Sequence, residues 1–328
     1  MSESRAPAMG RVIAAFAAVY LLWGSTYLAI RFAIETLPPL LMAGVRFLLA
    51  GAVLYAFMRL RGEPAPTRRH WKSAALIGAL LLVGGNGGVT LAERTVPSGV
   101  AALLVAMVPL WMVLLEWLRP GGTRPTGRVA VGLAVGFAGM VILVGPSQLA
   151  GAGAVDFGGA ALVLCGSLAW SIGSIYARRA TLPANAFVAT GMEMLCGGVL
   201  LLVAGAARGE LAGLDPAAFT GRSLAALAYL VVFGSLVGFT AYIWLLGVST
   251  PARVSTYAYV NPVVAVFLGW AMAGEAVTAR VLIAAAVIVA AVAVITTGPR
   301  PRAEPGALAG AAGPPGSKAR SRRRRQAA

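Results

Sequence analysis

Apolar residues run in long stretches along most of this chain, and short segments containing Pro, Gly or charged residues separate them. A helix that crosses the hydrocarbon core of a bilayer needs about 20 residues, which is close to the length of each stretch. Inside lipid every backbone polar group must be hydrogen-bonded, so helices are expected. The pattern predicts an all-α integral membrane protein with ten transmembrane helices, at 12–34, 39–58, 73–92, 97–118, 129–146, 157–177, 185–205, 223–247, 254–273 and 280–298.

The second half of the chain repeats the first. Residues 21–51 align on 168–198 without a gap and share seven identical positions, more than the apolar, Gly-rich composition explains. Each copy contains five stretches, an odd number, so the second copy enters the membrane from the opposite side. We therefore predict two inverted five-helix repeats, at 12–146 and 156–298.

Composition and charge agree with a membrane protein and fix its expected orientation. Of the 328 residues 59% are hydrophobic and only 12% are charged. With the N-terminus inside, the inner segments before the tail hold thirteen Lys and Arg residues and the outer loops hold four. The positive-inside rule then predicts cytoplasmic N- and C-termini. The net charge of +16 reports this topology and does not indicate a nucleic-acid partner.

Residues 299–328 differ from the rest of the chain. They are rich in Pro, Gly and Ala and end in a cluster of arginines, with little that could pack in a core. We predict a disordered, basic cytoplasmic tail. The tail either contacts anionic lipid headgroups or is a solvated run that reinforces the topology.

Motifs for catalysis and metal binding are missing from the sequence. Cys165 and Cys196 fall inside predicted spans, and a single histidine, His70, does not make a metal site. Phosphate-binding loops, H-E-x-x-H and G-x-S-x-G are also missing. We expect no enzyme activity, no cofactor and no metal.

Charged residues inside spans are costly and therefore candidates for function. Glu35 and Arg46 lie near the outer ends of the first two spans, and Arg178 and Glu193 lie near the inner ends of spans six and seven. Glu35 could pair with Arg46, and Arg178 or the adjacent Arg179 with Glu193, in mirrored positions. These pairs are either gates that break and form during transport or static clamps between neighbouring helices.

Aromatic and amide side chains form a second group of candidates. Pro109 and Pro262 weaken two spans at corresponding places, and such broken segments point toward a midplane substrate site. Taken singly, these aromatic residues are also typical of headgroup depth, and the glycines beside them of close helix packing. The expected substrate-binding residues are Trp23, Tyr27, Asn86, Trp170, Tyr257 and Asn261.

Several segments resemble the EamA domain of the drug/metabolite transporter superfamily. Within that superfamily the resemblance is strongest to the YedA-type exporters. The segments are 22–31 (LWGSTYLAIR), 38–47 (PPLLMAGVRF), 85–87 (GNG), 97–102 (PSGVAA) and 255–266 (STYAYVNPVVAV). The resemblance covers about 12–298 and implies ten helices in two inverted repeats around a central cavity. It also implies export of small metabolites across the bacterial inner membrane. One departure concerns the Gly-Glu pair that the family places after the fourth helix of each repeat. Gly274 and Glu275 supply it in the second copy, but residues 119–122 read RPGG in the first.

The sequence thus predicts a secondary transporter in the inner membrane that works by alternating access. Its substrates would be amino acids, related amphiphiles or drugs, held by aromatic faces and amides. A coupling proton, and a monomeric or homodimeric state, are left open. The alternative is a non-transporting membrane receptor or scaffold.

Overall fold

The computed structural model describes residues 9–120, 124–144, 156–249, 254 and 256–296. All regular secondary structure in this part of the chain is helical, which confirms the predicted all-α class. In chain order the helices are α1 (Met9–Ala33), α2 (Pro39–Leu60), α3 (Arg68–Gly78), η1 (Ala79–Gly87), α4 (Gly88–Ala92), α5 (Ser98–Val105), α6 (Val108–Leu118), α7 (Gly127–Val144), α9 (Phe157–Ala177), α10 (Ala186–Ala207), η2 (Pro216–Ala218), α11 (Gly221–Tyr229), η3 (Leu230–Val237), α12 (Gly238–Val248), α14 (Tyr257–Ala273) and α15 (Ala279–Thr296). The predicted tail, 299–328, lies outside the described residues.

In the part of the chain that the structure describes, seven helical segments are long and apolar enough to cross a membrane. They are 9–33, 39–60, 68–92, 98–118, 157–177, 186–207 and 221–245. Three further apolar helices are shorter, at Gly127–Leu143, Val260–Ala273 and Ala279–Val294. Each predicted apolar stretch therefore coincides with a helical segment, and the ends differ by a few residues.

The third span contains the glycine-rich segment 84–88, where the hydrogen-bonding pattern changes but the helix continues. Residues 79–87 form a π-helix between α3 and α4, and residues 230–237 form a second one between α11 and α12. A π-helical turn has an i→i+5 hydrogen bond and is frequent at functional sites. The fourth span, by contrast, is interrupted: α5 ends at Val105 and α6 begins at Val108, next to Pro109.

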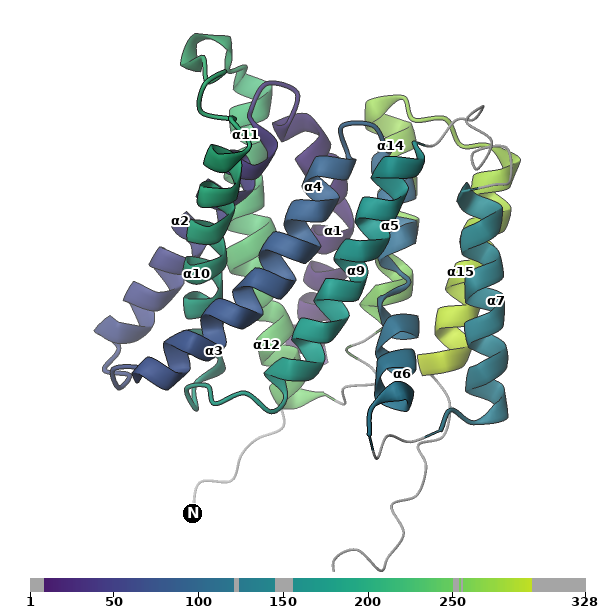
Figure 1. Ribbon diagram of the computed structural model, residues 1–328, viewed down its shortest axis with the longest axis horizontal. Helices are drawn as coiled ribbons and strands as arrows, with labels where there is room; N and C mark the ends of the chain where they lie inside the picture. Colours follow the sequence, from purple (N-terminus) through teal and green to yellow (C-terminus); the bar gives the residue numbers. More distant parts are fainter. Residues whose placement is uncertain (1–8, 121–123, 145–155, 250–253, 255, 297–328) are drawn as a thin grey trace, which may run out of the picture. The chain divides into compact units, whose positions relative to one another are not determined.

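The helices α2 and α10 pack with their backbones in close contact (Figure 1). A Cβ atom added to Gly51 of α2 would lie 2.7 Å from the backbone nitrogen of Leu195. A Cβ added to Gly198 of α10 would lie 2.7 Å from the backbone nitrogen of Leu48. These four positions are two pairs of repeat mates, so the contact is reciprocal. Small residues permit such close approach, as is common between helices in membranes.

Other large contacts also join a helix of the first half to a helix of the second half. The helix α7 packs on α15, which Figure 1 shows beside it, and α5 packs on α14. The helix α9 packs on η1 and α4, while α1 packs on α11, η3, α12 and α14. The two halves are therefore interleaved.

Hydrogen bonds between helix ends define two ends of the bundle. At one end, which we call the Glu93 end, the Glu210 carboxylate accepts from the backbone nitrogens of Leu40 (3.0 Å) and Leu41 (2.9 Å). These are orphan donors of the first turn of α2, so Glu210 caps that helix from the end of α10.

At the other end, which we call the Glu63 end, the side-chain nitrogen of Asn185 donates to Glu63 Oε1 at 2.7 Å. Residues just beyond α2 and α10 thus meet the beginning of the other helix at both ends. His70 belongs to a capping box with Thr67 that starts α3: His70 Nδ1 accepts from the Thr67 nitrogen at 3.2 Å. This side chain therefore has a local structural role.

Asp156 caps α9 at the Glu93 end. Its Oδ2 atom accepts from the Gly159 nitrogen at 2.7 Å and from Thr95 Oγ1 at 2.9 Å. The backbone hydrogen bond from Gly159, followed by the one from Thr95, lowers the pKa of Asp156 below its usual value, because both stabilise the charged carboxylate.

Candidate functional site

A cavity of about 320 Å³ lies among the helices of both halves. All six predicted substrate-binding residues line it: Trp23, Tyr27, Asn86, Trp170, Tyr257 and Asn261. They come from α1, η1, α9 and α14, which are far apart in sequence. The packing of first-half helices on second-half helices brings them together.

The aromatic residues form one wall of the cavity. The Trp23 ring meets Tyr257 edge to face, with centroids 5.2 Å apart, and Phe239 in the same way at 5.2 Å. Trp23 Nε1 donates to the carbonyl oxygen of Gly234 at 3.2 Å, which fixes the indole against the second π-helix. Such a wall suits an apolar or cationic part of a ligand.

The two amide residues differ in their freedom to bind a ligand. Asn261 is 6% exposed, and the amide orientation that satisfies its surroundings turns Nδ2 toward the carbonyl oxygens of Tyr20 (3.2 Å) and Tyr257 (3.3 Å). In this orientation its amide nitrogen donates to α1 and to α14 instead of to a ligand. Asn86 lies in the π-helix η1 and is half-buried at the cavity wall. A π turn contains one more residue than an α turn, so the side chains beside it point in other directions than they would in an α-helix. This explains why the segment reaches the cavity.

Arg46 is the cationic residue among those that line the cavity. It is 4% exposed, and its Nε atom donates to Ser235 Oγ of the second π-helix at 3.0 Å. Its guanidinium carbon lies 4.6 Å from the centre of the Phe47 ring. The Nε atom is thus held by a neutral hydroxyl, which leaves the positive charge without a counter-ion in direct contact in the described part of the chain.

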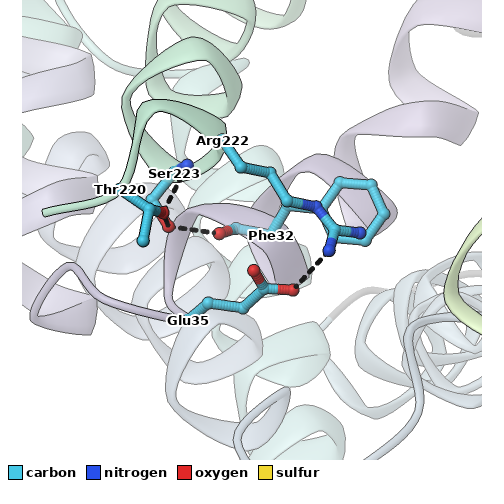
Figure 2. A network of polar contacts seen from close by, with 5 residues as sticks. All are labelled: Phe32, Glu35, Thr220, Arg222 and Ser223. Carbon is cyan, nitrogen blue, oxygen red and sulfur yellow. Dashed lines mark hydrogen bonds and ion pairs between the residues drawn. The ribbon is translucent and has the colours of Figure 1, made fainter.

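Neither predicted charge pair forms within the described residues. Glu35 lies 3.5 Å from Arg222, and not against Arg46, at the Glu93 end of the bundle (Figure 2). Arg222 stacks on the ring of Phe32 at 3.7 Å, beside a hydrogen bond from Ser223 to the Phe32 carbonyl oxygen. This stack directs Arg222 toward Glu35, whereas Arg46 is turned into the bundle from α2.

The second predicted pair, Arg178 with Glu193, is likewise not an ion pair within the described residues. Arg178 and Arg179 are exposed at the end of α9, and Glu193 is half-buried in the middle of α10. The backbone oxygen of Glu193 faces Gly78, where an added Cβ would lie 2.6 Å away. The arginines lie past the last turn of α9, so their reach is toward solvent.

The helices α5 and α14 pack closely on the side of the cavity that faces the Glu93 end. A Cβ on Gly99 would lie 2.9 Å from the Cα atom of Val266. The helix α6 instead packs on α9, where Trp111 Nε1 donates to Ser167 Oγ at 2.9 Å. The break before Pro109 thus lets one span pack on α14 with its first half and on α9 with its second.

The Gly-Glu pair after α14 has a structural role in the contact between α5 and α14. Gly274 has a φ of +65°, the left-handed conformation that ends α14. The chain then turns so that the Glu275 carboxylate accepts from the backbone nitrogens of Ser98 (2.7 Å) and Gly99 (3.1 Å) at the start of α5. The first copy lacks this acidic residue, and its Gly121 and Gly122 lie outside the described residues.

The family model for EamA-like transporters matches this chain twice, over residues 10–145 and 157–297. The chain belongs to the EamA-like transporter family. An uncharacterized inner membrane transporter, YedA of Escherichia coli (strain K12), is 44% identical to it over 282 residues, 86% of this chain and 89% of that protein. The resemblance noted in the sequence is therefore confirmed.

More distant EamA-like relatives cover the same region. The uncharacterized transporter YvbV of Bacillus subtilis (strain 168) is 23% identical over 278 residues, 84% of this chain and 88% of that protein. A solved crystal structure has the same fold, with a TM-score of 0.60 and 23% identity over 89% of this chain and 98% of that one. The chain is thus a membrane protein of a transporter family.

Several residues at the EamA-like cavity are not among the sequence candidates. Phe239 of α12 lines the cavity, and Ser235 of the second π-helix holds the cavity residue Arg46; both lie in a mostly apolar stretch of sequence. Ser167 lines the cavity and holds Trp111. The repeat could have pointed to Phe239 as a cavity residue, because the adjacent Thr240 is the position of the second copy that aligns with Asn86.

Proposed function

We propose that this chain is a secondary transporter that exports small metabolites or drugs by alternating access across the bacterial inner membrane. The observation that carries the proposal is the shared cavity, because its wall comes from helices of both halves. A site at the interface of two repeats is what alternating access requires.

The proposed architecture is ten spans in two inverted repeats with both termini in the cytoplasm. Support comes from the contacts of α2 with α10, α5 with α14 and α7 with α15, each of which joins corresponding members of the two copies. The two π-helices also occupy corresponding places. In the orientation given by the positive-inside rule, the Glu63 end is cytoplasmic, and we assign the close contact of α5 with α14 at the Glu93 end to an inward-facing state.

The proposed substrate is an amino acid or a related amphiphile. An aromatic wall accommodates its apolar part, and Arg46 attracts a carboxylate. The residues assigned to substrate binding are Trp23, Tyr27, Asn86, Trp170, Tyr257 and Asn261, while Asn261 also ties α14 to α1.

A screen tests the proposed function. Amino acids and cationic drugs are given to a strain that overexpresses the protein, and relief of toxicity identifies the substrates. The purified protein in liposomes is then assayed for exchange of each hit. Flux that depends on the protein supports a transporter. Binding without flux would favour the alternative, a non-transporting receptor.

Removal of the cavity cation tests the substrate class. Arg46→Ala deletes a charge-assisted hydrogen bond of about 1.5–3 kcal/mol to a carboxylate ligand. We expect uptake of anionic substrates into inverted vesicles to weaken by about ten- to a hundredfold in affinity, with neutral analogues little changed. Arg94→Ala is the matched control, because Arg94 is exposed and lies outside the cavity. Equal handling of anionic and neutral substrates by Arg46→Ala would remove Arg46 from carboxylate recognition.

A further inference from the structure

The Glu93 carboxyl group has no role in the site described so far. Glu93 follows the last residue of α4 and is 0% exposed. Neither carboxyl oxygen has a hydrogen-bond partner in the described part of the chain. A buried carboxyl group without partners is an exception in folded proteins and requires a reason.

The charged neighbours of Glu93 are occupied elsewhere. Arg31 donates from Nη1 to the backbone oxygen of Glu93 at 3.0 Å, not to its carboxyl group. Arg46 donates from Nε to Ser235. Both arginines interact with the Glu93 carboxyl group at longer range, as do Tyr27 and Glu275. The four titratable groups that face Glu93 come from α1, α2 and the segment after α14.

The neutral acid is the form that this environment favours. A carboxylate that is buried away from water loses its solvation energy. Without a hydrogen bond in the protein, little compensates for that loss. The Glu275 carboxylate is held on the first turn of α5 by Ser98 and Gly99, and a second negative charge beside it is unfavourable. The two arginines oppose this effect through space, but they supply no direct hydrogen bond.

Glu93 is adjacent both to the cavity and to the closed end. Val89, whose backbone oxygen accepts from the Glu93 nitrogen at 3.0 Å, lines the cavity together with Tyr27 and Arg46, so the cavity wall begins one helical turn from Glu93. Glu275 is attached to α14, whose contact with α5 closes the Glu93 end. Separation of α14 from α5 moves Glu275 away and admits water to Glu93.

We propose that Glu93 is the proton-binding site that couples transport to the proton gradient. The inference rests on the proposed function. One proton from water at the Glu93 end binds the Glu93 carboxylate, and the neutral acid allows α14 to close on α5 beside Glu275. Substrate entering the cavity from the Glu63 end displaces that proton into the cavity water, and the two carboxylates then repel each other and favour opening. One proton thus moves inward for each substrate that moves outward.

Infrared spectroscopy of the protein in lipid bilayers tests whether Glu93 binds a proton, and the measurement needs no substrate. Spectra are compared between about pH 5 and about pH 9, a range that covers buried carboxyl groups. We expect a titrating carboxylic-acid carbonyl signal to which Glu93 and the half-buried Glu193 both contribute, and which is reduced in Glu93→Gln and unchanged in the control Glu116→Gln. Glu116 is partly exposed and paired with Arg119 at 2.7 Å. A band of unchanged size in Glu93→Gln would overturn the proposal.

Glu275→Gln supplies a second test that does not depend on the folding of Glu93→Gln. Removal of the neighbouring negative charge makes the proton on Glu93 easier to lose, so the midpoint of its band moves to lower pH. The single oxygen of the glutamine side chain still accepts one of the two backbone hydrogen bonds, from Ser98 or from Gly99. An unmoved midpoint would contradict the interaction between the two carboxyl groups.

Spin labels test the link to closure. The exposed residues Arg94 and Ala276 lie at the Glu93 end and are replaced by cysteine in a Cys165→Ser, Cys196→Ser background. We expect the distance between the labels to increase from acid to alkaline pH, and to stay short at both in Glu93→Gln. A pH response that persists in Glu93→Gln would overturn the coupling. Loss of flux in liposomes with an intact pH response would instead refute the transporter.

Discussion

Replacing Gly51 by alanine inserts a methyl group into the contact between α2 and α10. The new Cβ atom would lie 2.7 Å from the nitrogen of Leu195 and 2.9 Å from the oxygen of Gly191. Both are backbone atoms, so no side-chain rotation relieves the overlap and the helices must separate. Overpacking of this kind costs about 1–3 kcal/mol.

The intrinsic helix preference of alanine acts in the opposite direction. Alanine in a helix interior is more favourable than glycine by about 1 kcal/mol. The expected net loss for Gly51→Ala is therefore up to about 2 kcal/mol, since the steric cost exceeds the gain in propensity. Gly198→Ala, the repeat mate, should lose a similar amount, because its Cβ would lie 2.7 Å from the Leu48 nitrogen. The double variant should lose less than the sum, since one separation of the helices relieves both overlaps.

Thermal unfolding of the purified protein in detergent, followed by tryptophan fluorescence, measures these changes. Gly127→Ala at the start of α7 is the matched control, because an added Cβ there meets nothing within 4 Å. We expect Gly127→Ala to unfold at or above the temperature of the parent. If Gly51→Ala and Gly198→Ala behave like Gly127→Ala, the close backbone contact between α2 and α10 is refuted.

Two further predictions concern the caps at the Glu93 end. Asp156→Asn keeps an oxygen acceptor but not the charge. The lowered pKa of Asp156 means that its stabilising effect is present above the unfolded-state value of about 3.9 and is lost as the pH falls through the folded-state value. Wild-type unfolding temperature should thus fall more steeply than that of Asp156→Asn in acid, and parallel curves would contradict this. Glu210→Ala should lower the stability by about 1 kcal/mol in the same assay through loss of the α2 cap; an unchanged unfolding temperature would exclude a stabilising cap.

The spans and much of the candidate site were predictable from the sequence because hydropathy reports which segments enter lipid. The repeat identified Trp23 and Trp170 as mates, and both line the cavity. It also aligned Gly51 with Gly198, and the structure shows why glycine stands at both positions. The spans and the pairs of equivalent positions depend only on the order of residues along the chain, which the sequence gives directly.

The partners of the charged side chains were not predictable in this way. Sequence places Glu35 and Arg46 at similar depth, but it does not give the rotation of each helix about its axis. The stack on Phe32 turns Arg222 toward Glu35, and α2 turns Arg46 toward Ser235.

The sequence by itself determined the apolar spans, the duplication and the residue types available to a binding site, because these follow from composition and local order. The tertiary structure decided which side chains converge on the cavity, that the first π-helix contributes Asn86 to it, and that Glu93 is buried without a hydrogen-bond partner in the described part of the chain. Glu93 looks like an ordinary loop residue in the sequence, since its burial is created by helices α1, α2 and α14 folding around it. Contacts between segments far apart in the chain set that burial, and no local pattern records them.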